Sequence, residues 1–289
     1  MHTPPADELG AHVSTEGGVV TAPARARVLD SVCLQLFTKQ PNRWAEPALD
    51  QGVVEEFRRA REAEAIRVAG AHDSYLINLS SPDRALWNRS LASFEAELRR
   101  CTALGLDFLV THPGNATDGR EEAGIRHNAE GIALALEAVG ESPTRVLLEL
   151  TAGSGTSVGG SFEKLAAILE EIPQTLRHRV GVCVDTCHAY AAGYDLVGDY
   201  DGVWDAFADV LGWSRLGLIH MNDSKHPLGS RKDRHENIAE GTLGPAPFRR
   251  IMLDPRLRGV PKILETPKGD DPVAADRANL ELLRSFRGG

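Results

Sequence analysis

The succession RVLLEL (145–150), SFEKLAAILEEIP (161–173) and VGVCVD (180–185) is the clearest structural pattern in the chain. The first and third segments are continuous apolar runs of strand length, which is typical of parallel strands buried on both faces. The middle segment is amphipathic, begins at Ser161 as an N-cap and ends before Pro173, so it is predicted to be a helix. The three segments together predict one strand–helix–strand unit of a parallel sheet.

The same alternation continues over the rest of the chain. Further apolar runs of strand length lie at 9–14, 31–37, 65–71, 106–111, 216–221 and 261–266, and amphipathic helices are predicted at 81–105 and 127–140. An open doubly wound sheet fits the alternation too, but eight strands favour a closed, single-domain (β/α)₈ TIM barrel. We expect this α/β barrel to be the catalytic domain over residues 9–285, between flexible tails at 1–8 and 286–289.

The composition is that of an ordinary globular protein, with 289 residues, 42% hydrophobic and 25% charged. The net charge of −9 is unusual for a nucleic-acid-binding protein, which normally carries a basic surface. No apolar run is long enough to span a membrane, and the start MHTPPADELGAHVS lacks the features of a secretory signal. The four cysteines lie in or beside apolar runs, which predicts a reducing compartment without disulfides. We therefore expect a cytoplasmic protein.

Residue types that bind metals stand at or just after the ends of six strand runs. They are His72, His112, Glu149, Asp185, His220 and Glu265. A single histidine after a strand is more often a turn residue than a ligand. The carboxyl ends of all strands in a TIM barrel meet at one face, so these six scattered side chains are predicted to converge there.

Local spacing adds three more residues to this set. Asp185 and His188 are three apart on a turn that leaves a strand, and Asp233 and His235 point the same way if the chain is extended. The nine candidates are too many for one ion and suit two or three. Five imidazoles favour Zn²⁺, Mn²⁺ or Fe²⁺ over Mg²⁺. Clustered divalent ions are typical of phosphoester hydrolysis, in which no serine or cysteine nucleophile is needed.

Long segments of the chain resemble the endonuclease IV family of zinc-dependent apurinic/apyrimidinic (AP) endonucleases. The resemblance runs from GAHVSTEGG (10–18) to LET (264–266), and its most specific parts are VDTCHAYAAGYD within 180–196 and NDSKHPLGSRKDRH within 220–244. The resemblance implies a (β/α)₈ barrel with three zinc ions. It also implies hydrolysis of the phosphodiester 5′ to an abasic site, leaving a 3′-hydroxyl and a 5′-deoxyribose phosphate, and trimming of blocked 3′ ends.

The resemblance further implies how the nine residues share the ions. One ion would be held by His72, His112 and Glu149, the second by Glu149, Asp185, His220 and Glu265, and the third by His188, Asp233 and His235. Glu149 and Glu265 are the implied catalytic residues, which orient the attacking water between the first two ions. Mn²⁺ can replace Zn²⁺ at nitrogen and oxygen sites of this kind.

The implied partner is double-stranded DNA that contains abasic sites. The candidates for contact with the lesion are Tyr75, Asn42 and Arg43, which follow two strand runs. Lys225 and Arg231 stand near the third ion site as phosphate contacts, and Lys39 is expected on the same face. We expect a monomer that binds no membrane and is associated with the nucleoid if the source is bacterial.

Another enzyme class remains open from the residues alone. Sugar isomerases and epimerases share this barrel type and use one or two divalent ions, but typically with fewer histidines. A binding module is a third alternative, although it has no need of nine ligands at one face. The loop GSGTSVGG (153–160) lacks the Gly-Lys-Ser/Thr of a P-loop and is predicted to lie beside the metal site. His12 is either a further residue of that cavity or a structural histidine.

Overall fold

Eight parallel strands pair side by side until the first strand meets the last, in the order β1-β10-β7-β6-β5-β4-β3-β2. The computed structural model describes residues 8–288. The strands are β1 (Leu9–His12), β2 (Cys33–Phe37), β3 (Val68–His72), β4 (Phe108–Thr111), β5 (Arg145–Leu150), β6 (Val180–Asp185), β7 (Leu216–His220) and β10 (Lys262–Leu264). The predicted TIM barrel is therefore confirmed.

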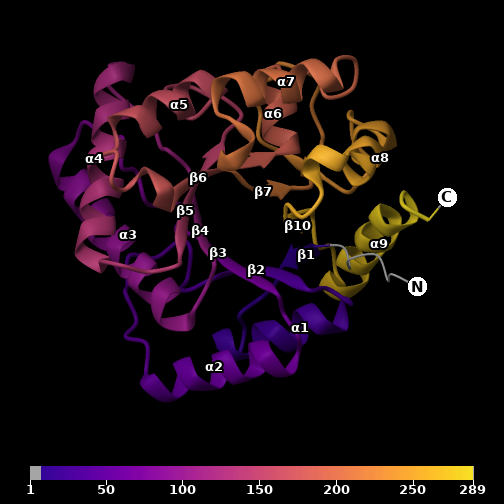
Figure 1. Cartoon of the computed structure of the whole chain (residues 1–289), viewed down its shortest axis with the longest axis horizontal. Coiled ribbons are helices and arrows are strands. Elements are labelled where there is room, and N and C mark those ends of the chain that lie inside the picture. The colour runs from indigo at the N-terminus through magenta and orange to yellow at the C-terminus, as the bar shows by residue number, and fades with distance from the viewer. Residues whose placement is uncertain (1–7, 289) are drawn as a thin grey trace.

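Helices surround the barrel on all sides (Figure 1). They are α1 (Ala22–Val28), α2 (Gln51–Ala63), α3 (Arg84–Leu104), α4 (Glu121–Val139), α5 (Phe162–Glu171), α6 (Thr186–Ala192), α7 (Tyr200–Val210), α8 (Pro245–Leu253) and α9 (Pro272–Ser285). Ser161 caps α5, as its sequence predicts, and its hydroxyl accepts a hydrogen bond from the Lys164 amide at 3.3 Å. Among residues 8–288, no helix combines the length and the apolar character that a membrane crossing requires.

Two layers of buried side chains hold the barrel together. One fills the barrel interior with Cys33, Phe108, Val110, Leu147, Cys183, Leu218 and Ile263. The other lies between the strands and the surrounding helices, where large side chains such as Phe57, Phe94 and Phe162 are fully buried. All four cysteines are free and buried, so they contribute to packing as small apolar residues.

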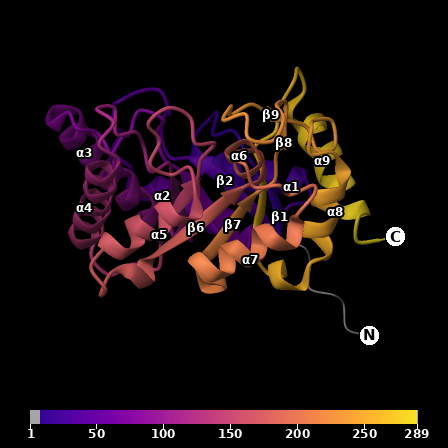
Figure 2. The same cartoon turned by 90° about the horizontal axis from the view of Figure 1, so that it is seen from above.

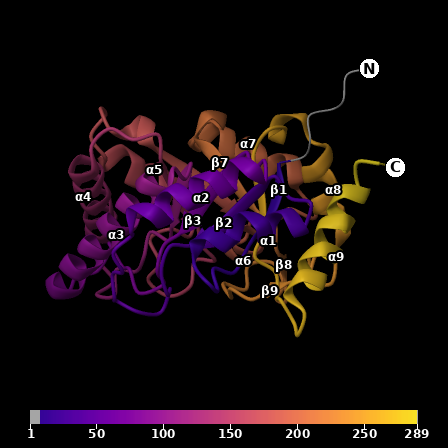
Figure 3. The ribbon, with the colours of Figure 1, turned by 90° about the horizontal axis from the view of Figure 1, so that it is seen from below.

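The site is positioned by the common direction of the strands. Because they are parallel, their carboxyl ends lie at one end of the barrel, where Phe37 pairs with His72 and Asp185 with His220. A short antiparallel ribbon of β8 (Asp223–Ser224) and β9 (His235–Glu236) belongs to the long connection between β7 and α8. Figures 2 and 3 show this ribbon and α7 at opposite edges of the molecule.

The structure changes some predicted boundaries. The third strand begins at Val68 rather than 65, because Ala65 closes the end of α2 with a positive φ of 53°. The fourth helix begins at Glu121, earlier than the predicted 127. The tail predicted over 1–8 lies outside the described residues except for Glu8, and the tail predicted over 286–289 lies inside them except for its last residue.

Candidate metal centre

All nine candidate ligands, six predicted from strand ends and three from local spacing, lie together at the carboxyl end of the barrel. Their potential ligand atoms form overlapping groups in which all atoms lie within 4.8 Å of one another. One group contains His72, His112 and Glu149, a second contains Glu149, Asp185, His220 and Glu265, and a third contains His188, Asp233 and His235. Residues separated by almost two hundred positions are thus brought together by the barrel.

Glu149 lies at the centre of the cluster and is fully buried. Its Oε2 lies 3.1 Å from His72 Nε2 and 3.3 Å from His112 Nε2. Its Oε1 lies 3.1 Å from His188 Nδ1 and 3.2 Å from His220 Nδ1. Glu149 is therefore placed to bridge two ions, since each of its oxygens faces different imidazoles.

Asp185 and His188 are arranged by the start of a helix. Asp185 is the last residue of β6 and the N-cap of α6, and its Oδ1 accepts a hydrogen bond from the His188 amide at 2.9 Å. The His188 side chain is then directed towards Asp233, with 3.2 Å between Nε2 and Oδ1. His235 Nε2 lies 3.4 Å from the same oxygen and completes the third group.

Four imidazoles of the cluster share one hydrogen-bonding pattern, in which one ring nitrogen faces a carbonyl oxygen. These contacts are His72 Nδ1 to Asp73 O (2.9 Å), His188 Nδ1 to Leu150 O (3.0 Å), His235 Nδ1 to Glu265 O (3.1 Å) and His220 Nε2 to Gln35 Oε1 (2.9 Å). Since an amide or peptide carbonyl only accepts, each of these nitrogens must carry the proton. The other nitrogen of each ring faces a carboxylate, and it would become the ligand atom once a bound metal takes the place of its proton.

Two of these ligand atoms are buried without a hydrogen-bond partner. Nε2 of His188 and Nε2 of His235 take part in no hydrogen bond within the described part of the chain. Each of these nitrogens lies 3.2 to 3.4 Å from Asp233 Oδ1 without forming a hydrogen bond, and because buried polar atoms are normally satisfied, this geometry suits an ion between them. The donor set of imidazoles and carboxylates, with buried lone pairs, therefore fits zinc or a similar divalent ion.

In the absence of metal, the carboxylates and imidazoles of the cluster stabilise each other's ionised forms. Burial raises the pKa of Glu149, but the charges of His220 and His112 outweigh burial and hold this pKa well below its usual range. Burial lowers the pKa of His72, but the hydrogen bond and charge of Glu149 raise it to about 10. Burial likewise opposes the ionised form of Asp233, but His188 and His235 lower its pKa to about 2. Carboxylates and imidazolium ions thus stabilise each other where divalent cations would otherwise balance the charge.

Several residues that support the cluster escape prediction from the sequence. Gln35 donates to Glu265 Oε1 at 2.6 Å and accepts from His220, and Asn222 donates to Asp185 Oδ2 at 2.6 Å. The sole signal for Gln35 is a polar residue inside the apolar strand CLQLF, and Asn222 lies just beyond a strand. His12 does face the cavity, with Nδ1 3.2 Å from Glu265 Oε1.

The residues predicted to contact DNA lie around the metal cluster or on exposed loops. Tyr75 is 59% exposed, and its ring centroid lies 5.8 Å from that of His72. Asn42, Arg43, Lys225 and Arg231 are exposed. The expectation for Lys39 is wrong: its amine is buried and pairs with Glu46, so it is not available to a phosphate.

A cleft of about 240 Å³ opens beside the cluster. It is lined by His112, Gly114, Asn115, Thr151, Ala152, Ser154, Ser157, His188 and Asp233. The loop 153–160 borders this cleft, as predicted, and Ser154 donates a hydrogen bond to the Arg231 carbonyl. The cleft therefore joins the first and third ligand groups to a wall of small polar side chains.

Comparison with known proteins agrees with this geometry. Residues 24–286 match the family described as "Xylose isomerase-like TIM barrel". The chain is 46% identical to "Probable endonuclease 4" of Geobacter sulfurreducens, covering 96% of this chain and 94% of that protein. It resembles the crystal structure of endonuclease IV from Thermus thermophilus with a TM-score of 0.86 and 38% identity, covering 97% of this chain and 98% of that one.

More distant structures share the architecture alone. An L-ribulose 3-epimerase has a TM-score of 0.69 and 12% identity, covering 97% of this chain and 96% of that one. Fold and site thus define a xylose isomerase-like TIM barrel with a cluster of candidate metal ligands at its carboxyl face. Within that class, the chain belongs to the endonuclease IV family of deoxyribonucleases.

Proposed function

We propose that this protein is a DNA-repair endonuclease that hydrolyses the phosphodiester 5′ to abasic sites in double-stranded DNA and trims blocked 3′ ends. The observation that carries the proposal is a set of four imidazoles, in each of which one ring nitrogen faces a carbonyl oxygen and the other faces a carboxylate. Such an arrangement suits a multinuclear metal centre, and endonuclease IV relatives supply the substrate class.

Three zinc ions fit the proposed ligand sets. His72, His112 and Glu149 would hold the first, Glu149, Asp185, His220 and Glu265 the second, and His188, Asp233 and His235 the third. Divalent ions in such sites lower the pKa of water and stabilise negative charge on a phosphate. Mn²⁺ is a suitable substitute, since the ligands are nitrogen and oxygen atoms.

In this proposal, Glu149 and Glu265 act as the catalytic carboxylates that orient the attacking water. Glu265 Oε1 is held by Gln35 and His12, which leaves Oε2 facing His220 at 3.2 Å. Attack of the water oxygen on phosphorus breaks the bond to the 3′ oxygen, which takes up a proton. The products are a 3′-hydroxyl and a 5′-deoxyribose phosphate.

Selection of the lesion would be geometric. An abasic nucleotide lacks base stacking, so its extrusion from the duplex costs less than that of an intact nucleotide. Tyr75, Asn42 and Arg43 would occupy the gap in the duplex, and Lys225 and Arg231 would contact phosphates. The local cations and bound metals would offset the net charge of −9.

An incision assay tests the proposal. Protein without added Mg²⁺ is mixed with a labelled duplex that contains one reduced abasic analogue, beside an intact duplex. The analogue cannot undergo β-elimination, so a nick on its 5′ side must be hydrolytic. We expect a nick that ends in a 3′-hydroxyl and that fades after prolonged chelation. Absence of a nick with fully metal-loaded protein would refute the proposal and favour a sugar isomerase or epimerase, to be tested by aldose–ketose screening.

A further inference from the structure

Four charged side chains form a cluster between the loop that follows β2 and helix α3. Lys39 belongs to this loop with Glu46, and Glu97 and Arg100 come from α3. The side chains of Lys39 and Glu97 are each only 1% exposed. Lys39 pairs with Glu46, its Nζ lies 3.7 Å from Glu97 Oε1, and Arg100 lies 2.8 Å from Glu46 Oε2. Two cations and two carboxylates therefore balance, and removal of one would leave a buried charge unpaired.

Glu97 receives hydrogen bonds from two different loops. Thr38, at the start of the loop after β2, donates its hydroxyl to Oε2 at 3.0 Å. Ser74, in the loop after β3, donates its backbone amide to Oε1 at 3.0 Å. Hydrogen bonds to a buried carboxylate are stronger than those between neutral groups. One carboxylate on a helix thus connects two loops that are otherwise separate in the sequence.

The two loops are also joined directly. The Ser74 hydroxyl donates to the Pro41 carbonyl at 2.5 Å. Pro41 precedes Asn42 and Arg43, and Ser74 precedes Tyr75, so the contact lies next to all three residues proposed to contact the lesion. The position of these residues therefore depends on the contacts of Ser74 and Glu97.

We infer that Glu97 is a positioning residue, which holds the loops after β2 and β3 in the arrangement that binds damaged DNA. The inference rests on the proposed function, because it assigns a task to the residues that contact the lesion. Thr38, Lys39 and Ser74, which Glu97 contacts, are not among the nine candidate metal ligands. Within residues 8–288, the hydrogen bonds and ion pairs of Glu97 include none of these nine ligands, so its substitution should affect DNA binding more than metal binding. Small displacements of groups that position a substrate have large effects on its binding and turnover.

The first test is Glu97→Gln in the full-length, metal-loaded protein. Glutamine keeps the shape but removes the charge and replaces one acceptor by a donor, which cannot accept from Thr38. We expect KM for the abasic duplex to rise about tenfold while kcat and metal content stay within about twofold of wild type. If Glu97→Gln does not fold, Ser74→Ala replaces it, because it removes the bond to Pro41 without affecting a buried charge.

A double-mutant cycle separates positioning from general stability. Tyr75→Ala removes the side chain that Glu97 is inferred to position. If Glu97 acts through this loop, its substitution should raise KM far less in the Tyr75→Ala background than in wild type. A purely structural role of Glu97 would give additive effects in the cycle and would overturn the inference.

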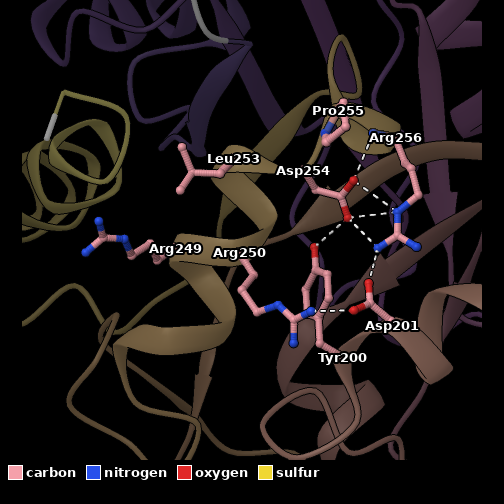
Figure 4. A pocket seen from close by; sticks show the side chains of 8 residues that line it. All are labelled: Tyr200, Asp201, Arg249, Arg250, Leu253, Asp254, Pro255 and Arg256. Carbon is pink, nitrogen blue, oxygen red and sulfur yellow. Dashed lines mark hydrogen bonds and ion pairs between the residues drawn. The ribbon is translucent and has the colours of Figure 1, made fainter.

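Asp254 provides a matched control. Its side chain is 5% exposed, accepts a hydrogen bond from the Tyr200 hydroxyl at 3.1 Å and pairs with Arg256 at 2.7 Å (Figure 4). It precedes the amino end of β10, whereas the metal cluster lies at the carboxyl ends of the strands. Asp254→Asn is expected to lower stability but to leave KM unchanged, and a KM rise equal to that of Glu97→Gln would overturn the inference.

The cleavage activity of wild type and the KM values of the variants distinguish a failure of this inference from a failure of the proposed function. If wild-type protein does not cut the abasic duplex, the proposed function fails before any variant is compared. If wild type cuts and both Glu97→Gln and Ser74→Ala retain the wild-type KM, the positioning role fails while the function stands.

Discussion

Glu149 has both carboxylate oxygens within 3.3 Å of imidazole nitrogens, and no solvent reaches its side chain. A carboxylate in this position can serve two ions at once, one through each oxygen. An amide of the same shape offers a single oxygen and no charge. The contribution of Glu149 to the reaction can therefore be tested without a change in side-chain size.

Glu149→Gln should fold but lose activity on abasic DNA. We expect kcat to fall by about a thousandfold or more, because the amide neither bridges two ions nor orients water as a carboxylate does. Incision rates and circular dichroism, measured on the same preparation, check both parts of this prediction. Cleavage near the wild-type rate would show that Glu149 has no bridging role.

His235→Ala should remove one metal ion selectively. His235 Nε2 is buried and makes no hydrogen bond within residues 8–288, and His235 belongs to no ligand group that contains Glu149. We therefore expect the metal content to fall by one ion per chain while the ions near Glu149 remain. His178→Ala, outside the cluster, serves as the control. An unchanged stoichiometry by elemental analysis would contradict the assignment of His235.

The convergence of the nine candidate ligands could be predicted from the sequence, but the side chains that support them could not. His72, Glu149 and Asp185 stand at strand ends, and strand ends converge in any barrel. Gln35 and Asn222 act through side-chain geometry, which no periodicity reveals. The burial of Lys39 could not be predicted, because a lysine after a strand gives no sign that Glu46 of the same loop and Glu97 of α3 surround it.

At the scale of elements, continuous apolar runs located all eight barrel strands, because parallel strands are buried on both faces. Helix ends were less well predicted. Ser161 identified the start of α5 by its capping hydroxyl. The start of α4 lacks a side-chain cap at Arg120, and the acidic pair Glu121 and Glu122 in its first turn is a weaker signal than a capping residue.

The closing strand β10 begins with a buried lysine that should make the free energy of unfolding depend on pH. Lys262 is its first residue, and burial lowers the pKa of this amine to about 8 from an ordinary 10.5, while Nζ donates to the carbonyls of Leu257 and Val260. Between these two values the unfolded chain binds more protons at Lys262 than the folded chain. The free energy of unfolding contributed by this residue therefore rises with pH across that window.

Lys262→Met should lack this pH dependence. Relative to the variant, wild type should gain about 3 kcal/mol in unfolding free energy between about pH 8 and about pH 10.5. Urea unfolding of both proteins across this range measures the difference, with Lys232→Met on the exposed loop as a control. Parallel pH profiles for wild type and Lys262→Met would refute the assignment.

At the scale of the whole molecule, the barrel concentrates opposite charges at one end of an acidic protein. His72 has a pKa of about 10 without metal, so it is protonated at neutral pH and must lose its proton to become a ligand. Zinc binding to protein that a chelator has freed of metal should therefore release protons. Calorimetric titration in buffers of different ionisation enthalpy measures this release, and a heat independent of the buffer would contradict it.

We propose above all that the nine residues form one centre with three ions. Anomalous diffraction from crystals of the zinc-loaded protein, collected on both sides of the zinc absorption edge, tests it directly. We predict three peaks at the carboxyl end of the barrel, one within each proposed ligand set, with Glu149 contacting two of them. Ions bound away from these side chains, or a fully loaded centre with a single peak, would contradict the three-ion assignment.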